Sequence, residues 1–367
     1  MTHPLPTNNR STFVFVSCAD DSSIDCYQLD TTINQLRYLR SVNTYGQVMP
    51  LAVSPDDKRL YATNASEAYQ LISYQIDHTD AALKKIAQTR LPASMTYITP
   101  DRQGKYLLCA SYHSDQLFVM PIINGQASES CAIYNTGLNA HCIIVHPLKN
   151  FVYSTSLGSD KLHQYQFNDQ NGQLTDIDKG YIDAPKGSGP RHIAISPDGH
   201  FLYVVTEMSA TVLCYRINLH GALSFFAEMA NFPHHYHHLK KSKRRDQVTP
   251  AEAPNSIWAS DIKLTPDGNF LYIAERTSST ISTFQIDKLT GLPHYIAACP
   301  VEKQPRSFAI DASGHYMIVT GQEDNHIGLY TINQQTGRLS PQTKAKVGKN
   351  ANWVEIITVP KENNTSC

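Results

Sequence analysis

The sequence has no long apolar run and no excess of charge of either sign. The first apolar stretch, Phe13–Val16, is far shorter than the roughly 20 residues that a membrane helix needs. The 31 Lys and Arg balance 32 Asp and Glu, which gives neither a basic footprint for nucleic acid nor a polybasic membrane anchor. Residues 1–11 are polar and lack the apolar core of a signal peptide. We therefore expect a cytoplasmic protein with no nucleic-acid or membrane partner.

Paired cysteines and the familiar catalytic motifs are also missing. The eight cysteines include no CxxC pair, and Cys18, Cys109 and Cys214 fall inside strand-like runs. Buried free thiols in a reducing compartment are the simplest interpretation. The chain has no glycine-rich phosphate loop, no serine nucleophile elbow and no HExxH motif. No residue pattern requires a cofactor or a metal, and we expect neither.

One phrase recurs along the chain: alternating apolar residues followed by Ser/Thr-Pro-Asp, as in Ile193–Tyr203 (IAISPDGHFLY). In such a turn proline presets φ, aspartate caps the turn and glycine tolerates positive φ. Seven anchor positions mark the copies: Pro55, Pro100, Pro147, Pro197, Pro266, Ala312 and Pro360. Successive anchors are 45, 47, 50, 69, 46 and 48 residues apart, a spacing typical of four-stranded propeller blades.

The repeats predict an all-β fold, a seven-bladed β-propeller with four-stranded antiparallel blades. The last copy has no later strands, and the strand-like runs Thr12–Ser17, Ile24–Leu29 and Leu36–Val42 precede the first anchor. The two ends of the chain are therefore expected to share one blade, which removes the free sheet edges. Two separate β domains or a β-sandwich are the alternatives. We expect a single domain over residues 12–360, between a disordered tail at 1–11 and a C-terminal tail at 361–367.

The longest step between anchors contains an inserted loop at about 232–257. It holds the runs HHYHH (234–238) and KKSKRR (240–245). Clustered histidines can bind a metal. The segment is polar and offers no carboxylate at ligand spacing, so a solvated loop is the expectation, with a phosphate-attracting rim as the alternative.

Polar residues interrupt the apolar strands at two fixed distances from the anchors. The anchor turn joins the first and second strands of a blade, so the start of the first and the end of the second lie at the opposite edge. Six residues before the anchors stand Met49, Ser94, His141, Arg191, Ser260, Arg306 and Val354, and ten residues after them stand Glu207, Arg276 and Gln322. We expect five of these to gather on one rim at the channel mouth: His141, Arg191, Glu207, Arg276 and Arg306. They form either a functional site or a structural ion-pair network.

Such a cluster suits an anionic substrate that carries a carbonyl group. Arginines recognise phosphate or carboxylate in a bidentate manner, and Arg or His can stabilise a developing oxyanion. Either Glu207 or His141 could act as general base on water, and an imidazole ordinarily titrates near neutrality. Arg306, His192 and Gln322 are candidate substrate-binding residues. His192 is the weakest of these, because strict alternation turns it to the other sheet face.

Five segments resemble the propeller-type lactonase family, which includes bacterial 6-phosphogluconolactonases and is related to the fungal carboxymuconate lactonizing enzyme. They are Gly137–His141, Gly187–Gly199, Tyr203–Val212, Trp258–Ile281 and Gln304–Gln322. The resemblance covers Phe13 to Pro360 and implies that His141, Arg191, Glu207 and Arg276 form the catalytic group. It implies hydrolysis of 6-phospho-D-glucono-1,5-lactone to 6-phosphogluconate, in the pentose phosphate pathway, by a monomer or weak oligomer.

Two departures and two alternatives accompany this resemblance. The segment between Phe232 and Ile257 is longer than in typical members, and residues Asn350–Trp353 replace a glycine–proline ahead of the tryptophan. A muconate-type lactonizing cycloisomerase would use similar arginine pairs for carboxylates. A non-catalytic propeller that binds a protein partner would instead present hydrophobic anchors on the rim, whereas the predicted rim is charged.

Overall fold

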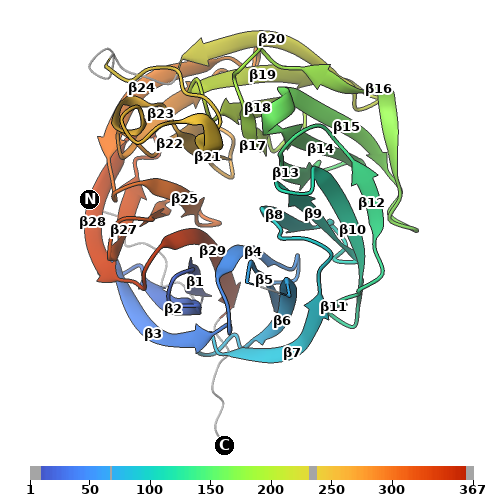
Figure 1. The fold of residues 1–367 in the computed structure, drawn as a ribbon. Coiled ribbons are helices and arrows are strands. Elements are labelled where there is room, and N and C mark those ends of the chain that lie inside the picture. The colour runs from blue at the N-terminus through green and yellow to red at the C-terminus, as the bar shows by residue number, and fades with distance from the viewer. Residues whose placement is uncertain (1–9, 67, 231–237, 361–367) are drawn as a thin grey trace, which may run out of the picture.

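Seven antiparallel sheets stand around a common axis in the computed structural model, which describes residues 10–66, 68–230 and 238–360 (Figure 1). Within each sheet, hydrogen bonds connect neighbouring strands from the innermost strand at the axis to the outermost at the rim. The predicted seven-bladed β-propeller is thus confirmed.

The first three blades follow one another from the N-terminal half of the chain. Blade 1 contains β4 (Val48–Val53), β5 (Arg59–Asn64), β6 (Gln70–Ile76) and β7 (Leu83–Arg90). Blade 2 contains β8 (Tyr97–Pro100), β9 (Tyr106–Ser111), β10 (Gln116–Ile123), β11 (Gln126–Ala127) and β12 (Ala132–Asn135). Blade 3 contains β13 (Ala140–Val145), β14 (Phe151–Ser156), β15 (Lys161–Phe167) and β16 (Leu174–Asp183), with the short helix η1 (Leu157–Ser159) between its middle strands. In blade 2 the outer position is divided between β11 and β12, which both pair with β10.

The next three blades have four strands each. Blade 4 contains β17 (Pro190–Ile195), β18 (Phe201–Thr206), β19 (Thr211–Ile217) and β20 (Leu223–Ala230). Blade 5 contains β21 (Ala259–Leu264), β22 (Phe270–Glu275), β23 (Thr280–Ile286) and β24 (Pro293–Pro300). Blade 6 contains β25 (Pro305–Ile310), β26 (Tyr316–Gly321), β27 (His326–Ile332) and β28 (Leu339–Lys346).

Both ends of the chain build the seventh blade. Its inner strand is β29 (Ala351–Pro360), followed outward by β1 (Arg10–Cys18), β2 (Ser23–Asp30) and β3 (Gln35–Asn43). Strand β1 pairs with β29 from Arg10 opposite Pro360 to Cys18 opposite Ala351. The first strand therefore begins at Arg10, and the expectation of a tail through residue 11 was wrong by two residues, because the long β29 offers them partners. The other expected tail residues, 1–9 and 361–367, lie outside the described residues.

A tyrosine in the second strand of three blades ties each blade to the next. The hydroxyl of Tyr153 donates to the carbonyl of Gly221 at 2.8 Å, Tyr203 to Gly291 at 2.9 Å and Tyr272 to Gly337 at 2.8 Å. These tyrosines are fully buried. A hydroxyl in such a place needs a partner, and the repeated bond satisfies it while fixing the spacing between blades.

The cysteines that were expected to be buried free thiols are confirmed as such in the structure. Cys18, Cys109 and Cys214 are buried and unpaired. Within the described parts of the chain, no helix combines the length and the apolar character of a membrane span.

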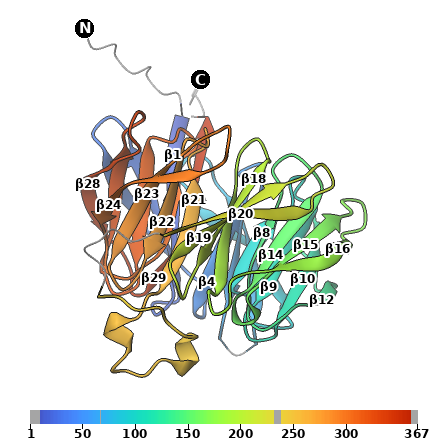
Figure 2. The same cartoon turned by 90° about the horizontal axis from the view of Figure 1, so that it is seen from above.

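The two faces of the disc differ in what they present. The anchor turns lie on the face where the described chain begins and ends, which we call the face of the termini, because the last anchor, Pro360, pairs with Arg10. The insertion between β20 and β21 projects from the opposite face (Figure 2). It contains the short helices η3 (Arg245–Gln247) and η4 (Ala253–Asn255). The inner strands begin on this second face, and the predicted site residues stand where these strands begin.

Candidate active site

A β-bulge displaces the residue six positions before the anchor in several inner strands. The pairing of β13 with β14 skips His141, that of β17 with β18 skips Arg191, and that of β25 with β26 skips Arg306. An extra residue in one strand bends it and redirects its side chain. The side chains of these three residues therefore do not follow the in-and-out alternation of the strands that hold them. In blade 5 the pairing skips both Ser260 and Asp261.

Glu207 and Arg276 come directly after the second strands of blades 4 and 5. The amide of Glu207 donates to the carbonyl of Gly189 at 2.7 Å, and the amide of Arg276 donates to that of Trp258 at 3.1 Å. These bonds hold both residues at the edge where the inner strands begin. Glu207 and Arg276 thus lie on the same rim as the bulged residues of the inner strands.

Glu207 lies between two guanidinium groups. Its Oε2 is 2.7 Å from Nε of Arg191 and 3.0 Å from Nη2 of Arg276. All three side chains are at least nine-tenths buried. Burial alone would raise the pKa of Glu207, but the charges of Arg276 and Arg191 outweigh it, and the pKa lies below its ordinary value. Glu207 is therefore a carboxylate at neutral pH and a firm anchor for both arginines.

A buried chain of hydrogen-bonded polar groups holds the guanidinium of Arg191 in place. Its Nη1 contacts Nε2 of His192 at 3.1 Å and donates to the carbonyl of Ser260. Nδ1 of His192 lies 2.8 Å from Oδ1 of Asp261. A guanidinium only donates, so Nε2 of His192 accepts and its Nδ1–H donates to Asp261. Burial and then the charge of Arg191 lower the pKa of His192 to about 3, so the imidazole is neutral.

These contacts change the interpretation of His192. Both of its ring nitrogens have protein partners, which leaves none for a substrate, and the bulge at Arg191 brings the two side chains together despite their neighbouring positions. His192 thus positions Arg191. Asp261, which sequence reasoning missed, in turn orients His192. Its signal was a carboxylate in the apolar strand Ala259–Leu264.

His141 is buried close to the same guanidinium groups. Its ring centroid lies 5.9 Å from that of Tyr112 and 5.2 Å from that of His192. Its Nδ1 is buried and has no hydrogen-bond partner among the described residues. Burial, and then the charge of Arg191, hold the pKa of His141 well below 6.5. The expectation that this imidazole titrates near neutrality is therefore corrected: it is an uncharged acceptor throughout the neutral range.

Arg306 contributes a third guanidinium to the cluster. No hydrogen bond or ion pair of Arg306 is present within the described ranges. Burial, followed by the charges of Arg191 and Arg276, lowers its pKa. An unpaired cation beside two others is electrostatically unfavourable until an anion neutralises it. This arrangement is what an anion-binding site requires.

Gln322 is the one predicted residue that the structure keeps apart from the cluster. Its side-chain amide donates to Oδ1 of Asn350 at 2.9 Å, which links blades 6 and 7. The structure thus brings together His141 and three arginines around Glu207, adds His192 and Asp261 beneath them, and leaves Gln322 elsewhere on the rim.

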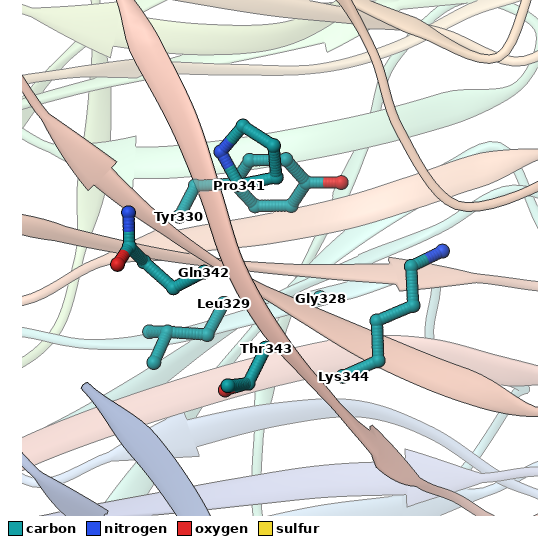
Figure 3. Close-up of a pocket in the computed structure, with 7 residues that line it drawn as sticks. All are labelled: Gly328, Leu329, Tyr330, Pro341, Gln342, Thr343 and Lys344. Atoms are coloured by element: carbon teal, nitrogen blue, oxygen red, sulfur yellow. The ribbon is translucent and has the colours of Figure 1, made fainter. Parts of the chain in front are cut away.

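Two surface hollows lie away from this cluster. One, of about 140 Å³, sits on β27 and β28 (Figure 3). There Lys344 and Tyr330 satisfy the buried carboxylate of Glu302 at 3.2 and 3.1 Å, which indicates a structural role. The other, of about 400 Å³, is lined by residues of the first anchor turn, including Pro55 and Asp56. Neither contains a predicted site residue.

The described residues include no group of three or more His, Cys, Asp or Glu side chains that could hold a metal ion. Most of the HHYHH run, residues 234–237, lies outside the described residues.

Fold and side chains together define a class: a seven-bladed β-propeller with a cluster of arginine side chains around a buried glutamate on one face. A comparison with protein families places it more narrowly. The family described as "Lactonase, 7-bladed beta-propeller" matches residues 13–356, and the chain belongs to this family.

Named relatives and solved structures extend the comparison. The chain is 31% identical over 345 residues to the 6-phosphogluconolactonase of Serratia proteamaculans, covering 94% of this chain and 98% of that protein. It is 32% identical to the 6-phosphogluconolactonase of Yersinia pseudotuberculosis, with 94% and 97% covered. The structure of the periplasmic gluconolactonase of Pseudomonas aeruginosa superposes with a TM-score of 0.81 at 22% identity, covering 96% of this chain and all of that one. A Bacteroides fragilis structure gives 0.82 at 21% identity, with 97% and 100% covered. These two structural matches establish a shared fold.

Proposed function

We propose that this protein is a lactonase that hydrolyses 6-phospho-D-glucono-1,5-lactone to 6-phosphogluconate, a step of the pentose phosphate pathway. One observation carries the proposal: Glu207 is held by Arg191 and Arg276 beside the unpaired guanidinium of Arg306 and the uncharged, unpartnered ring of His141. The names of the relatives that match nearly the whole chain support the same substrate.

The charge balance of the cluster favours a phosphorylated substrate. The buried guanidiniums of Arg191 and Arg276 and the partly buried one of Arg306 surround the carboxylate of Glu207, so the group carries an excess of positive charge. A phosphate monoester is close to a dianion at neutral pH and offers three acceptor oxygens. Arginine matches such oxygens with two parallel donors. An uncharged lactone would leave this excess uncompensated.

The geometry supports a division of labour between acid–base chemistry and positioning. His141 takes a proton from water as the water oxygen bonds to the carbonyl carbon of the lactone, and the carbonyl electron pair moves to oxygen. Arg191 and Arg276 stabilise that oxyanion. Its collapse breaks the bond to the ring oxygen, which receives the proton from His141. The carboxylate of Glu207 is already paired with Arg191 and Arg276 and serves to hold them, whereas Nδ1 of His141 has no hydrogen-bond partner among the described residues.

A direct assay tests this function. Acid release from freshly prepared 6-phosphogluconolactone is followed by pH-stat, and the spontaneous rate is subtracted. We expect hydrolysis that is proportional to enzyme and unchanged by EDTA. A rate equal to the spontaneous one would refute the lactonase assignment. Loss of activity on chelation, restored by zinc or calcium, would show instead that a metal takes part.

We further propose that the enzyme acts in the cytoplasm as a monomer or weak oligomer. The seven described cysteines are all unpaired, as in proteins of reducing compartments. Light scattering coupled to gel filtration should give the mass of one chain, 41.0 kDa, at micromolar concentration. A stable dimer under these conditions would contradict the oligomeric part of the proposal.

A further inference from the structure

The insertion between blades 4 and 5 is attached to the candidate active site. Its Ser242 amide donates to the carbonyl of Met208 at 2.8 Å, next to Glu207. The Ser242 hydroxyl accepts from Nε1 of Trp258 at 2.9 Å. Ser242 is buried, although it belongs to the KKSKRR run that was expected to be a solvated loop. The insertion is therefore fixed to the rim at Ser242, and the residues that follow Ser242 in the chain continue from this attached point.

Trp258 links the insertion to the catalytic arginines. The guanidinium carbon of Arg245 lies 5.3 Å from the centroid of the Trp258 ring, and that of Arg276 lies 5.8 Å from the same ring. Cations within about 6 Å of an indole ring are attracted by its electrons. Trp258 thus holds two like charges near each other. The charge of Arg245 also reaches Arg306, whose pKa it helps to lower.

Arg245 differs from its neighbours in having no acidic partner in the described structure. Lys243 pairs with Glu252 at 3.3 Å, and Arg244 pairs with Asp246 at 3.3 Å. Arg245 is exposed, and its guanidinium contacts the ring of Trp258. Arg245 is therefore a charge without an ion-pair partner that the insertion brings to the rim of the site, beside Trp258.

We propose that Arg245 selects phosphorylated over unphosphorylated lactones by receiving the phosphate group together with Arg306. This inference rests on the proposed function and adds a specificity residue from the insertion. The carbonyl group of the lactone faces Arg191 and Arg276, and its phosphate faces Arg306 and Arg245, the two guanidiniums that have no ion pair in the described structure. The insertion thus supplies substrate selectivity and leaves the reacting atoms to the propeller itself.

The test compares Arg245→Ala with Lys243→Ala, which removes the same charge from the same segment. For each variant, kcat/KM is measured with 6-phosphogluconolactone and with glucono-1,5-lactone. Arg245→Ala should lower the ratio of the two values by about five- to tenfold, mainly through a higher KM for the phosphorylated lactone. Lys243→Ala should keep the ratio within about twofold of the wild type. An Arg245→Ala variant with an unchanged ratio would overturn the proposal.

Binding of inorganic phosphate separates this inference from the proposed function. Calorimetry should show weaker phosphate binding in Arg245→Ala than in the wild type and in Lys243→Ala, whether or not either lactone is hydrolysed. Equal phosphate affinity in all three proteins would exclude Arg245 from the anion site. Absence of lactone hydrolysis in the wild type would count against the proposed function alone.

Discussion

The two faces of the disc use polar side chains in opposite ways. On the face of the termini, the anchor turns repeat one solution: Ser54 donates to Asp56 at 2.6 Å, and Ser196 donates to Asp198 at 2.5 Å. On the other face, Nδ1 of His141 is buried without a hydrogen-bond partner, and the partly buried Arg306 has no ion pair, within the described ranges. Satisfied polar groups stabilise a fold, whereas unsatisfied buried ones cost stability and persist where a ligand completes them. The polar groups of the first face stabilise the propeller, and those of the second face include the unsatisfied groups that the proposed substrate would complete.

The largest expected effect comes from the face with unsatisfied groups. Replacing His141 by Asn keeps a polar side chain but removes the proton acceptor. We expect kcat to fall by about 10²- to 10⁴-fold, the usual contribution of a general base, with little change in KM. Steady-state kinetics on 6-phosphogluconolactone measures both. If His141→Asn retains kcat while Glu207→Gln loses it, the carboxylate is the base and the roles are exchanged.

The pH profile of the same residue sharpens this prediction. The lowered pKa keeps His141 unprotonated in the free enzyme, so kcat/KM should stay level down to pH values well below 6.5. Bound phosphate adds negative charge and raises the pKa, so the acidic limb of kcat should lie at higher pH than that of kcat/KM. The limb should disappear in His141→Asn. Limbs at the same pH in both profiles would show that the substrate does not influence this imidazole.

The same lowered pKa makes a prediction about stability. Below about pH 6.5 the unfolded histidine binds a proton that the folded protein excludes, so the free energy of unfolding falls as the pH drops through this range. Denaturant titrations should show a smaller fall for His141→Asn between pH 7 and pH 5. An identical pH dependence in both proteins would contradict a buried neutral imidazole.

Asp261 should have an intermediate effect, because it acts through His192 and Arg191. Asp261→Asn keeps the size of the side chain but removes the charge that orients the His192 ring. We expect kcat to fall by about tenfold to a hundredfold through misplacement of Arg191, with a smaller change in KM. Ser307→Ala, which removes only the 3.3 Å bond to Oδ2 of Asp261, is the matched control. A folded Asp261→Asn protein with full kcat would remove the positioning role.

The smallest effect on catalysis is expected on the face of the termini. Oδ1 of Asp267 accepts from Thr265 Oγ1 at 2.6 Å and from the amide of Asn269 at 3.0 Å. Asp267→Ala should lower the free energy of unfolding by about 1 kcal/mol. Because the turn lies on the face opposite the site, kcat/KM should remain at the wild-type value. A large loss of activity without unfolding would mean that the two faces are not independent.

The repeat made the fold predictable and located most of the site. Anchor spacing defined the blades, and departures from the repeat at fixed offsets pointed to His141 and Arg191. The β-bulges could not be predicted, because they arise from pairing between strands and leave no mark in composition. For that reason the contact between Arg191 and His192 was missed. The insertion has no counterpart in other blades. The register of the repeat therefore could not predict that Arg245 lies beside Trp258.

The ratio of kcat/KM for 6-phosphogluconolactone to that for glucono-1,5-lactone tests the central claim most directly. If the unpaired guanidiniums exist to receive a phosphate, the phosphorylated lactone should be preferred by at least about tenfold, because a single charge-assisted contact contributes roughly 1.5–3 kcal/mol. The preference should weaken as ionic strength rises. Equal values for the two lactones would contradict the account, because the positive charge gathered around Glu207 would then have no role in choosing the substrate.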